Sequence, residues 1–361
     1  MTWSIDSRKL SASLVAACLA VGWSGAALAQ APQPWTIQGK LTGKPKNLEG
    51  SESKNSKDVS GIACATESGF PRLCLIADDE TQGAQIIILQ DGKLIAGDFV
   101  RLIDDSFVGK PLELDAEGVA FAGGAFYVIG SYGRPRHESG VDAAAEVEAR
   151  VMASSEIFRI RFAPDSIDMT TGKLMAEPEK RRSTELPAIV RAQPELAPFA
   201  QSPLEENGLT IEGVAVRDGA LLAGLRGPVL EGNRAVILSV PLGMLFDHGP
   251  GGATLLKLEL GVDGEGHARG VRDLLAYQGK LLVLAGPVND PPEGQPIKLG
   301  DYSVFSDGDQ ADKLLDLEGY GAEIKPEALL PLGEADGRLR ALLLFDGPAG
   351  GQPTPVEFGL K

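Results

Sequence analysis

The sequence predicts an all-β fold, a β-propeller in which four-stranded sheets circle a central axis. Two observations lead to this fold class. Short apolar runs bounded by turn residues recur along the chain, and five segments resemble one another at intervals close to the length of one blade. Each segment places a short strand of small residues next to a strongly apolar strand across a glycine-containing turn. The five segments begin at Val59, Ala116, Ile211, Val271 and Pro326.

The number of blades follows from the spacing of the repeat. The second residues of the segments are 57, 95, 60 and 55 residues apart. The long interval corresponds to one unit plus an insertion, which predicts five blades. A sixth blade within that interval and an irregular β-sandwich are the alternatives. The N-terminal segment "WTIQGKLTG" is predicted to be the outer strand of the last blade, so that it closes the ring and removes a sheet edge.

Two insertions interrupt the repeat, at about residues 134–155 and 175–207. The first has helical composition and follows the second strand of blade two, which places it at the rim of the central channel. It is expected to form a loop and helix that cover the channel mouth as a lid, or else a surface excursion with no role. The second insertion is rich in proline and charged residues and is predicted to be a packing loop.

Residues 1–29 are predicted to be a signal peptide. Arg8 and Lys9 precede an apolar run, and Ala27 and Ala29 have the spacing that signal peptidase requires, so cleavage is expected before Gln30. A retained membrane anchor and a lipid anchor at Cys18 are the alternatives. The mature chain, residues 30–361, is then a single propeller domain, periplasmic or secreted, with no further apolar run long enough to span a membrane.

The charge balance narrows the classes of partner. The chain carries a formal net charge of −16, which repels nucleic acid and anionic lipid. A small-molecule ligand is the expected partner, and the sequence identifies no protein partner. Cys64 and Cys74 flank a turn, so a disulfide between them is predicted in an oxidising compartment, with two reduced core cysteines as the alternative. Their spacing is wrong for a zinc site.

Polar residues gather at two places in each unit, the start of the innermost strand and the end of the second. In an antiparallel blade these two places lie on the same face, so the residues are expected to meet at one rim of the channel. Glu117, Glu212 and Glu327 would repel one another there, and they are predicted to hold a divalent cation such as calcium. Ion pairing with the nearby arginines is the alternative. The predicted ligand-binding residues are Asp78, Asp79, Glu80, Asp115, Ser131, Arg134, Arg136, Arg226 and Arg272, with Asp273 and Asp346 close by.

No standard catalytic signature is present, and the catalytic residues stay unknown. The chain lacks a nucleophile elbow, a zinc-protease motif and a P-loop. His137 is the one histidine near the predicted rim. The enzymatic hypothesis is a metal-assisted phosphoester hydrolase in which Arg226, with Arg134 or Arg136, orients the anion and a carboxylate acts as the base. The alternative is a non-catalytic binding or scaffold propeller with structural ion pairs at the rim.

Several motifs together resemble the bacterial domain-of-unknown-function 3616 family over most of the mature chain. They are "SGIA" at Ser60, "ADDE" at Ala77, "LDAEGVAF" at Leu114, "YVIGSYGRPR" at Tyr127 and "IEGVAV" with "LRGP" from Ile211. The resemblance implies a propeller-like fold and no established activity. A more distant resemblance to phytase-like propellers implies calcium and phosphoesters. In the family a histidine often stands where this chain has Tyr132, and Arg272 and Asp273 replace the "EG" of the fourth unit.

Overall fold

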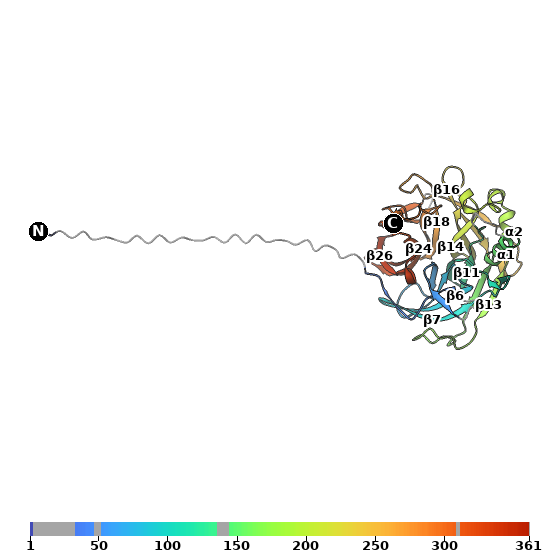
Figure 1. The fold of residues 1–361 in the computed structure, drawn as a ribbon, viewed down its shortest axis with the longest axis horizontal. Helices are drawn as coiled ribbons and strands as arrows, with labels where there is room; N and C mark the ends of the chain where they lie inside the picture. Colours follow the sequence, from blue (N-terminus) through green and yellow to red (C-terminus); the bar gives the residue numbers. More distant parts are fainter. Residues whose placement is uncertain (3–32, 47–51, 136–143, 308–310, 361) are drawn as a thin grey trace. The chain divides into compact units, whose positions relative to one another are not determined.

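The computed structural model of the chain describes residues 1–2, 33–46, 52–135, 144–307 and 311–360, and residues 32–361 form one compact unit. In the described part of this unit the strands build five main sheets, each of which is one blade of a β-propeller. Figure 1 shows β14, β18 and β24 near the middle of the unit and β7, β13 and β26 toward its periphery. The predicted fold class and the count of five blades are therefore confirmed.

Each blade runs outward from the axis in sequence order. Blade one consists of β4 (Val59–Cys64), β5 (Arg72–Asp78), β6 (Gly83–Gln90) and β7 (Lys93–Arg101). Blade two consists of β10 (Ala116–Ala122), β11 (Ala125–Gly130), β12 (Ile157–Arg161) and β13 (Glu179–Ser183). Blade three consists of β14 (Thr210–Arg217), β15 (Ala220–Gly227), β16 (Arg234–Pro241) and β17 (Thr254–Glu259). Blade four consists of β18 (Arg269–Tyr277), β19 (Lys280–Pro287), β21 (Ser303–Ser306) and β22 (Asp312–Asp316), and blade five of β24 (Lys325–Ala335), β25 (Arg338–Asp346) and β26 (Thr354–Gly359).

Short elements connect the blades. The short strands are β1 (Thr36–Gln38), β2 (Thr42–Pro45), β3 (Ser53–Asn55), β8 (Ser106–Phe107), β9 (Lys110–Pro111), β20 (Pro296–Ile297) and β23 (Tyr320–Ala322). The helices are α1 (Ala144–Ser154), α2 (Leu186–Arg191) and α3 (Leu242–Phe246), with 3₁₀ turns η1 (Ala197–Phe199), η2 (Leu204–Glu206) and η3 (Ala349–Gly351). The helix expected from the composition of the first insertion is α1. Of the helices in the described ranges, none has the length and apolar character needed to cross a membrane.

The second insertion is more regular than the packing loop that the sequence predicts. It contains β13, which pairs antiparallel with β12 and is the outer strand of blade two, and α2, η1 and η2 follow it. The first four residues of β13, "EKRR", are exposed. The outer strand of a blade lies at the solvent-exposed edge of the sheet and buries little apolar surface. Its residues can therefore be charged, and it lacks the apolar run that identifies the inner strands.

The N-terminal strand joins the first blade and not the last, which corrects the predicted ring closure. β1 pairs in parallel with β7, with Thr36 opposite Lys93. Blade five therefore keeps three strands, and its outer strand β26 has two features that blunt a sheet edge. Pro355 has no N–H to donate, and Arg338 Nη2 donates to the carbonyl of Glu357 at 3.0 Å.

Main-chain hydrogen bonds still close the ring between the N-terminal segment and blade five. The Trp35 N–H donates to the Pro353 carbonyl at 2.7 Å, and the Gly350 N–H donates to the Ser56 carbonyl at 2.8 Å. The side chain of Trp35 is 8% exposed and packs in a cluster with residues of blades one and five. The two ends of the domain are thus joined without a shared sheet.

The hydrophobic core of the described chain is divided into five wedges, one between each pair of neighbouring blades. Between blades one and two, for example, Leu75 and Ile86 pack with Val128. Between blades three and four, Ile237 packs with Val271. Both faces of every blade are therefore covered, which explains why the strands are nearly continuous apolar runs and not alternating patterns.

The inner strands crowd around the axis, as the sequence predicts. They contact one another in the order β4, β10, β14, β18 and β24, and β24 contacts β4. A Cβ atom on Gly61 would lie 2.8 Å from Gly118 Cα, and one on Gly213 would lie 2.7 Å from the Leu274 nitrogen. Both distances are shorter than any normal contact, so these positions require glycine.

Asp273 takes the glycine position in blade four and ties this blade to the next. Its Oδ1 accepts a hydrogen bond from the Leu274 N–H, and its Oδ2 accepts one from the Leu329 N–H on β24, both at 2.8 Å. The carboxylate is buried, and it satisfies amides on two blades at once. The departure of the fourth unit from the repeat therefore has a structural role.

The two cysteines face each other across the first hairpin. Cys64 on β4 pairs in register with Cys74 on β5, and the two form a disulfide. The predicted disulfide is confirmed. A disulfide of this kind is typical of an oxidising environment.

Replacing Trp35 tests the ring closure. The Trp35→Ala variant is expected to lose about 3 kcal/mol of unfolding free energy, because a buried aromatic side chain between blades one and five is removed. Chemical denaturation of the two proteins measures this difference. Trp35→Phe should lose less than half as much, and a Trp35→Ala protein as stable as the parent would show that the contact is dispensable.

Replacing Asp273 tests the link between blades four and five. Asp273→Ala leaves two buried amides without acceptors and is expected to cost about 3 kcal/mol of unfolding free energy. Asp273→Asn keeps an acceptor oxygen and should recover about half of that loss. Equal stability of the alanine and asparagine variants would contradict the proposed role of the carboxylate.

Candidate functional site

The inner strand of each described blade carries a β-bulge at the same position. In β14, Ile211 pairs with Leu225 and Gly213 pairs with Gly224, so Glu212 has no partner on β15. The same skipped residue occurs in the other four blades. A bulge adds one residue on one strand and re-aims its side chain. The five extra residues are Ser60, Glu117, Glu212, Arg272 and Glu327.

All five bulge residues line one cavity of about 600 Å³ at the mouth of the central channel. This confirms that residues far apart in the sequence converge around one axis. Other predicted rim residues also line the cavity: Asp79, Asp115, Ser131, Arg134, Arg226 and Asp346. Helix α1 contributes Glu146, Arg150 and Ser154, so the first insertion forms part of the cavity wall.

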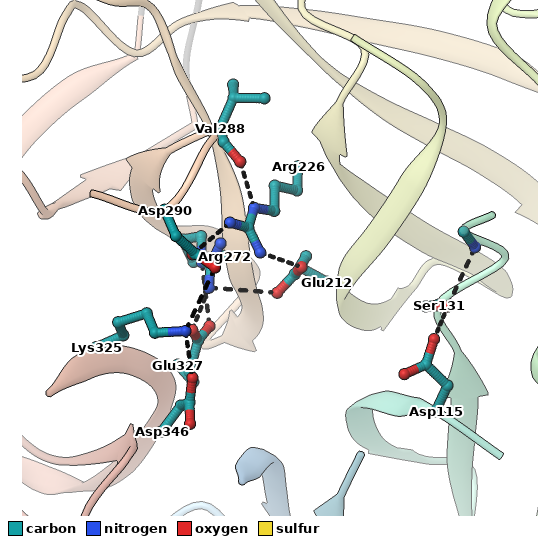
Figure 2. A network of polar contacts seen from close by, with 11 residues as sticks. Asp115, Ser131, Glu212, Arg226, Arg272, Val288, Asp290, Lys325, Glu327 and Asp346 are labelled. Carbon is teal, nitrogen blue, oxygen red and sulfur yellow. Dashed lines mark hydrogen bonds and ion pairs between the residues drawn. The ribbon is translucent and has the colours of Figure 1, made fainter. Parts of the chain in front are cut away.

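Arg226 is the centre of an ion-pair network on one side of the cavity (Figure 2). Its Nη1 lies 3.1 Å from Glu212 Oε1, and its Nη2 lies 2.6 Å from Asp290 Oδ1. Its Nε donates to the Val288 carbonyl at 2.5 Å. Each nitrogen of this guanidinium therefore has a protein partner.

Arg272 extends the network to blade five. Its Nε donates to Glu327 Oε2 at 3.1 Å, its Nη2 bonds Glu327 Oε1, and the same Nη2 lies 3.6 Å from Glu212 Oε2. Burial alone would lower the pKa of Arg272, but the charges of Glu212 and Glu327 raise that pKa well above its usual range. The guanidinium therefore stays charged. Its Nη1 is buried and has no hydrogen-bond partner among the described residues.

Lys325 completes this side of the cavity. Its Nζ lies 2.6 Å from Asp346 Oδ2 and 3.6 Å from Asp290 Oδ2. The network thus joins blades three, four and five and contains both signs of charge. This is the arrangement that the ion-pair alternative describes for Glu212 and Glu327.

Three carboxylates group on the other side of the cavity. Oxygen atoms of Asp79, Asp115 and Glu117 all lie within 4.8 Å of one another. Asp79 belongs to the turn after β5, Glu117 is the bulge residue of β10, and Asp115 precedes β10 with a left-handed φ of 54°. The Ser131 hydroxyl bonds Asp115 Oδ2, and Figure 2 shows this pair across the opening from Glu212.

The carboxylate group lacks the compensation that the arginine side has. Within the described ranges no lysine or arginine forms an ion pair with Asp79 or Glu117, and Asp79 Oδ1 is buried without a hydrogen-bond partner. Burial raises the pKa of Asp79 well above its ordinary value, and the charge of Asp115 adds to this rise. Burial, Glu212 and Asp115 raise the pKa of Glu117 in the same way. The repulsion among these carboxylates is offset only if one of them is protonated or a cation binds beside them.

The remaining predicted site residues are Asp78, Glu80, Arg134 and Arg136, and of these only Arg134 is shown to line the main cavity. Asp78 faces a separate small cavity beside Ser56, and Glu80 pairs with Lys44 at 2.5 Å. Arg134 lines the main cavity while its Nη2 pairs with Glu148 at 3.0 Å. Arg136 and His137 lie outside the described residues. Tyr132 is buried behind the rim, with a φ of 59°, and does not line the cavity.

Sequence reasoning missed several residues that line the cavity. Asp290 lies three residues after the "LAGP" end of β19, outside the strand ends where the repeat places its polar residues, and Lys325 precedes the bulge of β24 by two residues. Lys44, Glu113 and Thr210 also line the wall. Lys44 and Glu113 come from connecting segments outside the repeat, where no pattern signals them.

The fold resembles solved propeller structures at low sequence identity. An exo-β-1,3-galactanase, 1,3Gal43A from Clostridium thermocellum, is 12% identical with a TM-score of 0.44, over 90% of this chain and 62% of that one. The chain thus spans less than two thirds of the galactanase. The arabinanase Arb43A of Bacillus subtilis is 10% identical with a TM-score of 0.35, over 85% of this chain and 94% of that one. The WD40 β-propeller domain of Doa1 is 9% identical with a TM-score of 0.27, over 82% and 67% of the two chains.

These structural similarities concern the fold and carry no information on ligand or reaction. No curated protein sequence matches the chain. The pattern that defines the family "Protein of unknown function (DUF3616)" matches residues 62–349, which is most of the chain and includes every bulge residue except Ser60. The chain therefore belongs to the DUF3616 family.

Proposed function

We propose that the channel mouth binds a divalent cation through Asp79, Asp115 and Glu117, and with it a small anionic ligand. The observation that carries this proposal is the group of three half-buried carboxylates whose oxygens lie within 4.8 Å of one another, one of which has a buried oxygen without a hydrogen-bond partner in the described chain. Burying such charges without compensation is costly, and a cation offsets that cost.

Calcium is the cation that suits this site. It prefers carboxylate, carbonyl and hydroxyl oxygens, and it accepts irregular geometry built from several loops. The three carboxylates come from two blades, and Ser131 provides a hydroxyl beside Asp115. The predicted set of Glu117, Glu212 and Glu327 is modified in this proposal, because Glu212 and Glu327 already neutralise Arg226 and Arg272.

The arginine side supplies the preference for an anion. A negatively charged group on the cation would face Arg226 and Arg272 across the same cavity. Arg272 Nη1, buried and without a hydrogen-bond partner in the described chain, is the donor left for it. Arg226 would act by its charge, since its nitrogens are engaged by Glu212, Asp290 and Val288.

The predicted cellular location is compatible with this function. A signal peptide over residues 1–29 would carry the chain to the periplasm or outside the cell, and the Cys64–Cys74 disulfide suits such a compartment. Extracellular calcium sites commonly have dissociation constants of about 10⁻⁴–10⁻³ M, which a site of three carboxylates and few other ligands would match.

Phosphoester hydrolysis is the enzymatic form of this proposal. A bound divalent cation supplies charge stabilisation to a phosphoryl oxygen. The chain's own residues would hold the phosphate opposite Arg272, and a cavity carboxylate outside the cation site would accept the proton of the attacking water as the ester alcohol leaves. The second candidate is a binding or scaffold propeller, and the complete set of partners around Arg226 favours it, since that guanidinium already has a structural role.

Calcium dependence of stability tests the cation site. Calcium at about a hundredfold excess over the dissociation constant is expected to add about 2.7 kcal/mol, or about 5 °C in melting temperature, over the protein in a chelator. Asp79→Asn and Glu117→Gln should abolish the shift. Glu113→Gln removes a carboxylate that lines the same cavity and pairs with Lys44, so it is the matched control and should keep the shift. No shift in the parent protein would refute the cation site.

Hydrolysis of p-nitrophenyl phosphate and bis(p-nitrophenyl) phosphate tests the enzymatic form. Calcium-dependent product release is expected, with a loss of at least about a hundredfold in Asp79→Asn, as for removal of a key electrostatic group. If calcium stabilises the protein but neither ester is cleaved, the binding propeller is the function that remains.

A further inference from the structure

The central channel has a second cavity at the end opposite the mouth. It measures about 320 Å³ and is lined by later residues of the same inner strands that begin at the mouth, from Ile62 on β4 to Leu330 on β24. Ligand cavities in proteins are commonly of this size or larger. The layer of charged bulge residues belongs to the mouth cavity and lines no part of this one.

Most of the side chains that line this far cavity are apolar, and five of them are alanine. Apart from Thr66, Glu67 and Arg72, every residue that lines it is apolar. Alanine recurs around the ring, at Ala63, Ala65, Ala120, Ala215 and Ala276. Large side chains at these positions would fill the channel, as they do in small closed barrels. The alanines therefore keep this space open.

Arg72 is the one cation in this apolar wall. It is the first residue of β5 and is only 2% exposed. Its Nη1 donates to the Pro331 carbonyl on β24 at 2.6 Å, and its Nη2 bonds the Thr66 carbonyl. Among the described residues, its buried Nε has no hydrogen-bond partner and no carboxylate forms a salt bridge with the guanidinium.

The charge of Arg72 is incompletely compensated. Burial lowers its pKa to about 10, and the guanidinium still carries its proton at neutral pH. Glu67 is the acidic residue in the cavity wall, and it is exposed, so solvent screens its effect on Arg72. A buried charge without an opposite charge close by is costly, and a ligand that supplies one gains that energy on binding.

We infer that the far cavity is a second ligand site, which takes a small apolar monocarboxylate. The carboxylate would lie where Arg72 borders the cavity and offset the charge of the guanidinium, and the hydrocarbon part would lie against the alanine-lined wall. A single negative charge matches the single positive charge, whereas a dianion would leave an excess charge in an apolar cavity. This site is independent of the proposed calcium site, because no residue lines both cavities.

Calorimetric titration with hexanoate tests the inference, with 1-hexanol as the uncharged probe of the same length. Hexanoate is expected to bind with a dissociation constant of about 1 mM or tighter, and hexanol at least about tenfold more weakly, because hexanol has no charge to offset that of Arg72. Arg72→Met should remove the preference for hexanoate. Equal affinity of the parent protein for the two probes, or no binding of hexanoate, overturns the proposal.

A second variant keeps the test sharp if Arg72→Met does not fold. Ala276 is partly exposed and lines the far cavity, so Ala276→Phe fills the space without touching the guanidinium. This variant should bind hexanoate at least about tenfold more weakly than the parent protein while keeping its calcium response. Unchanged hexanoate affinity in Ala276→Phe would place the carboxylate elsewhere and overturn the inference.

Discussion

Five inner strands meet around one axis, and the space between them does not admit a side chain at every position. Glycine at 61, 118 and 213 relieves the crowding, since a Cβ there would meet the next strand. One residue earlier, a bulge turns a longer polar side chain toward the opening. The same local irregularity, repeated in every blade, thus provides both the close approach of the strands and the polar ring. The mouth depends on closure of the ring and not on any one loop.

Burial makes the charges of this ring interdependent. In a low-dielectric environment both attraction and repulsion are stronger than in water. Arg226 and Arg272 are held by carboxylates on three blades, and this half is nearly complete within the protein. Asp79 and Glu117 have no basic partner in the described chain, and this half is not complete. Residues in equivalent positions of the repeat therefore have different roles, which depend on the neighbouring blade.

Much of the fold could be predicted from the sequence. Each blade is covered on both faces, so its inner strands appear as apolar runs that recur at a regular interval. The polar ring could be predicted for the same reason, since its members occupy one position of the repeat. The strands at the sheet edges could not be predicted, because β13 is charged where it faces solvent and β1 is only three residues long. It could not be predicted either which carboxylates pair with arginines and which group together without a basic partner. Arg272 reaches a glutamate 55 positions away, and the turn after β5 alone decides that Asp79, and not Asp78, faces the cavity.

The junction of Trp35 with the segment before β26 bears on how the chain reaches its folded state. Blade one is synthesised first, yet one of its faces, which includes Val59 and Ile76, is covered by blade five. That face stays exposed to water until the C-terminal strands have been synthesised. Contacts between residues so far apart in the sequence also form slowly. A nascent chain carrying four blades has two uncovered apolar surfaces and is prone to associate with its neighbours. Folding of the C-terminal strands onto blade one therefore competes with association between incomplete chains.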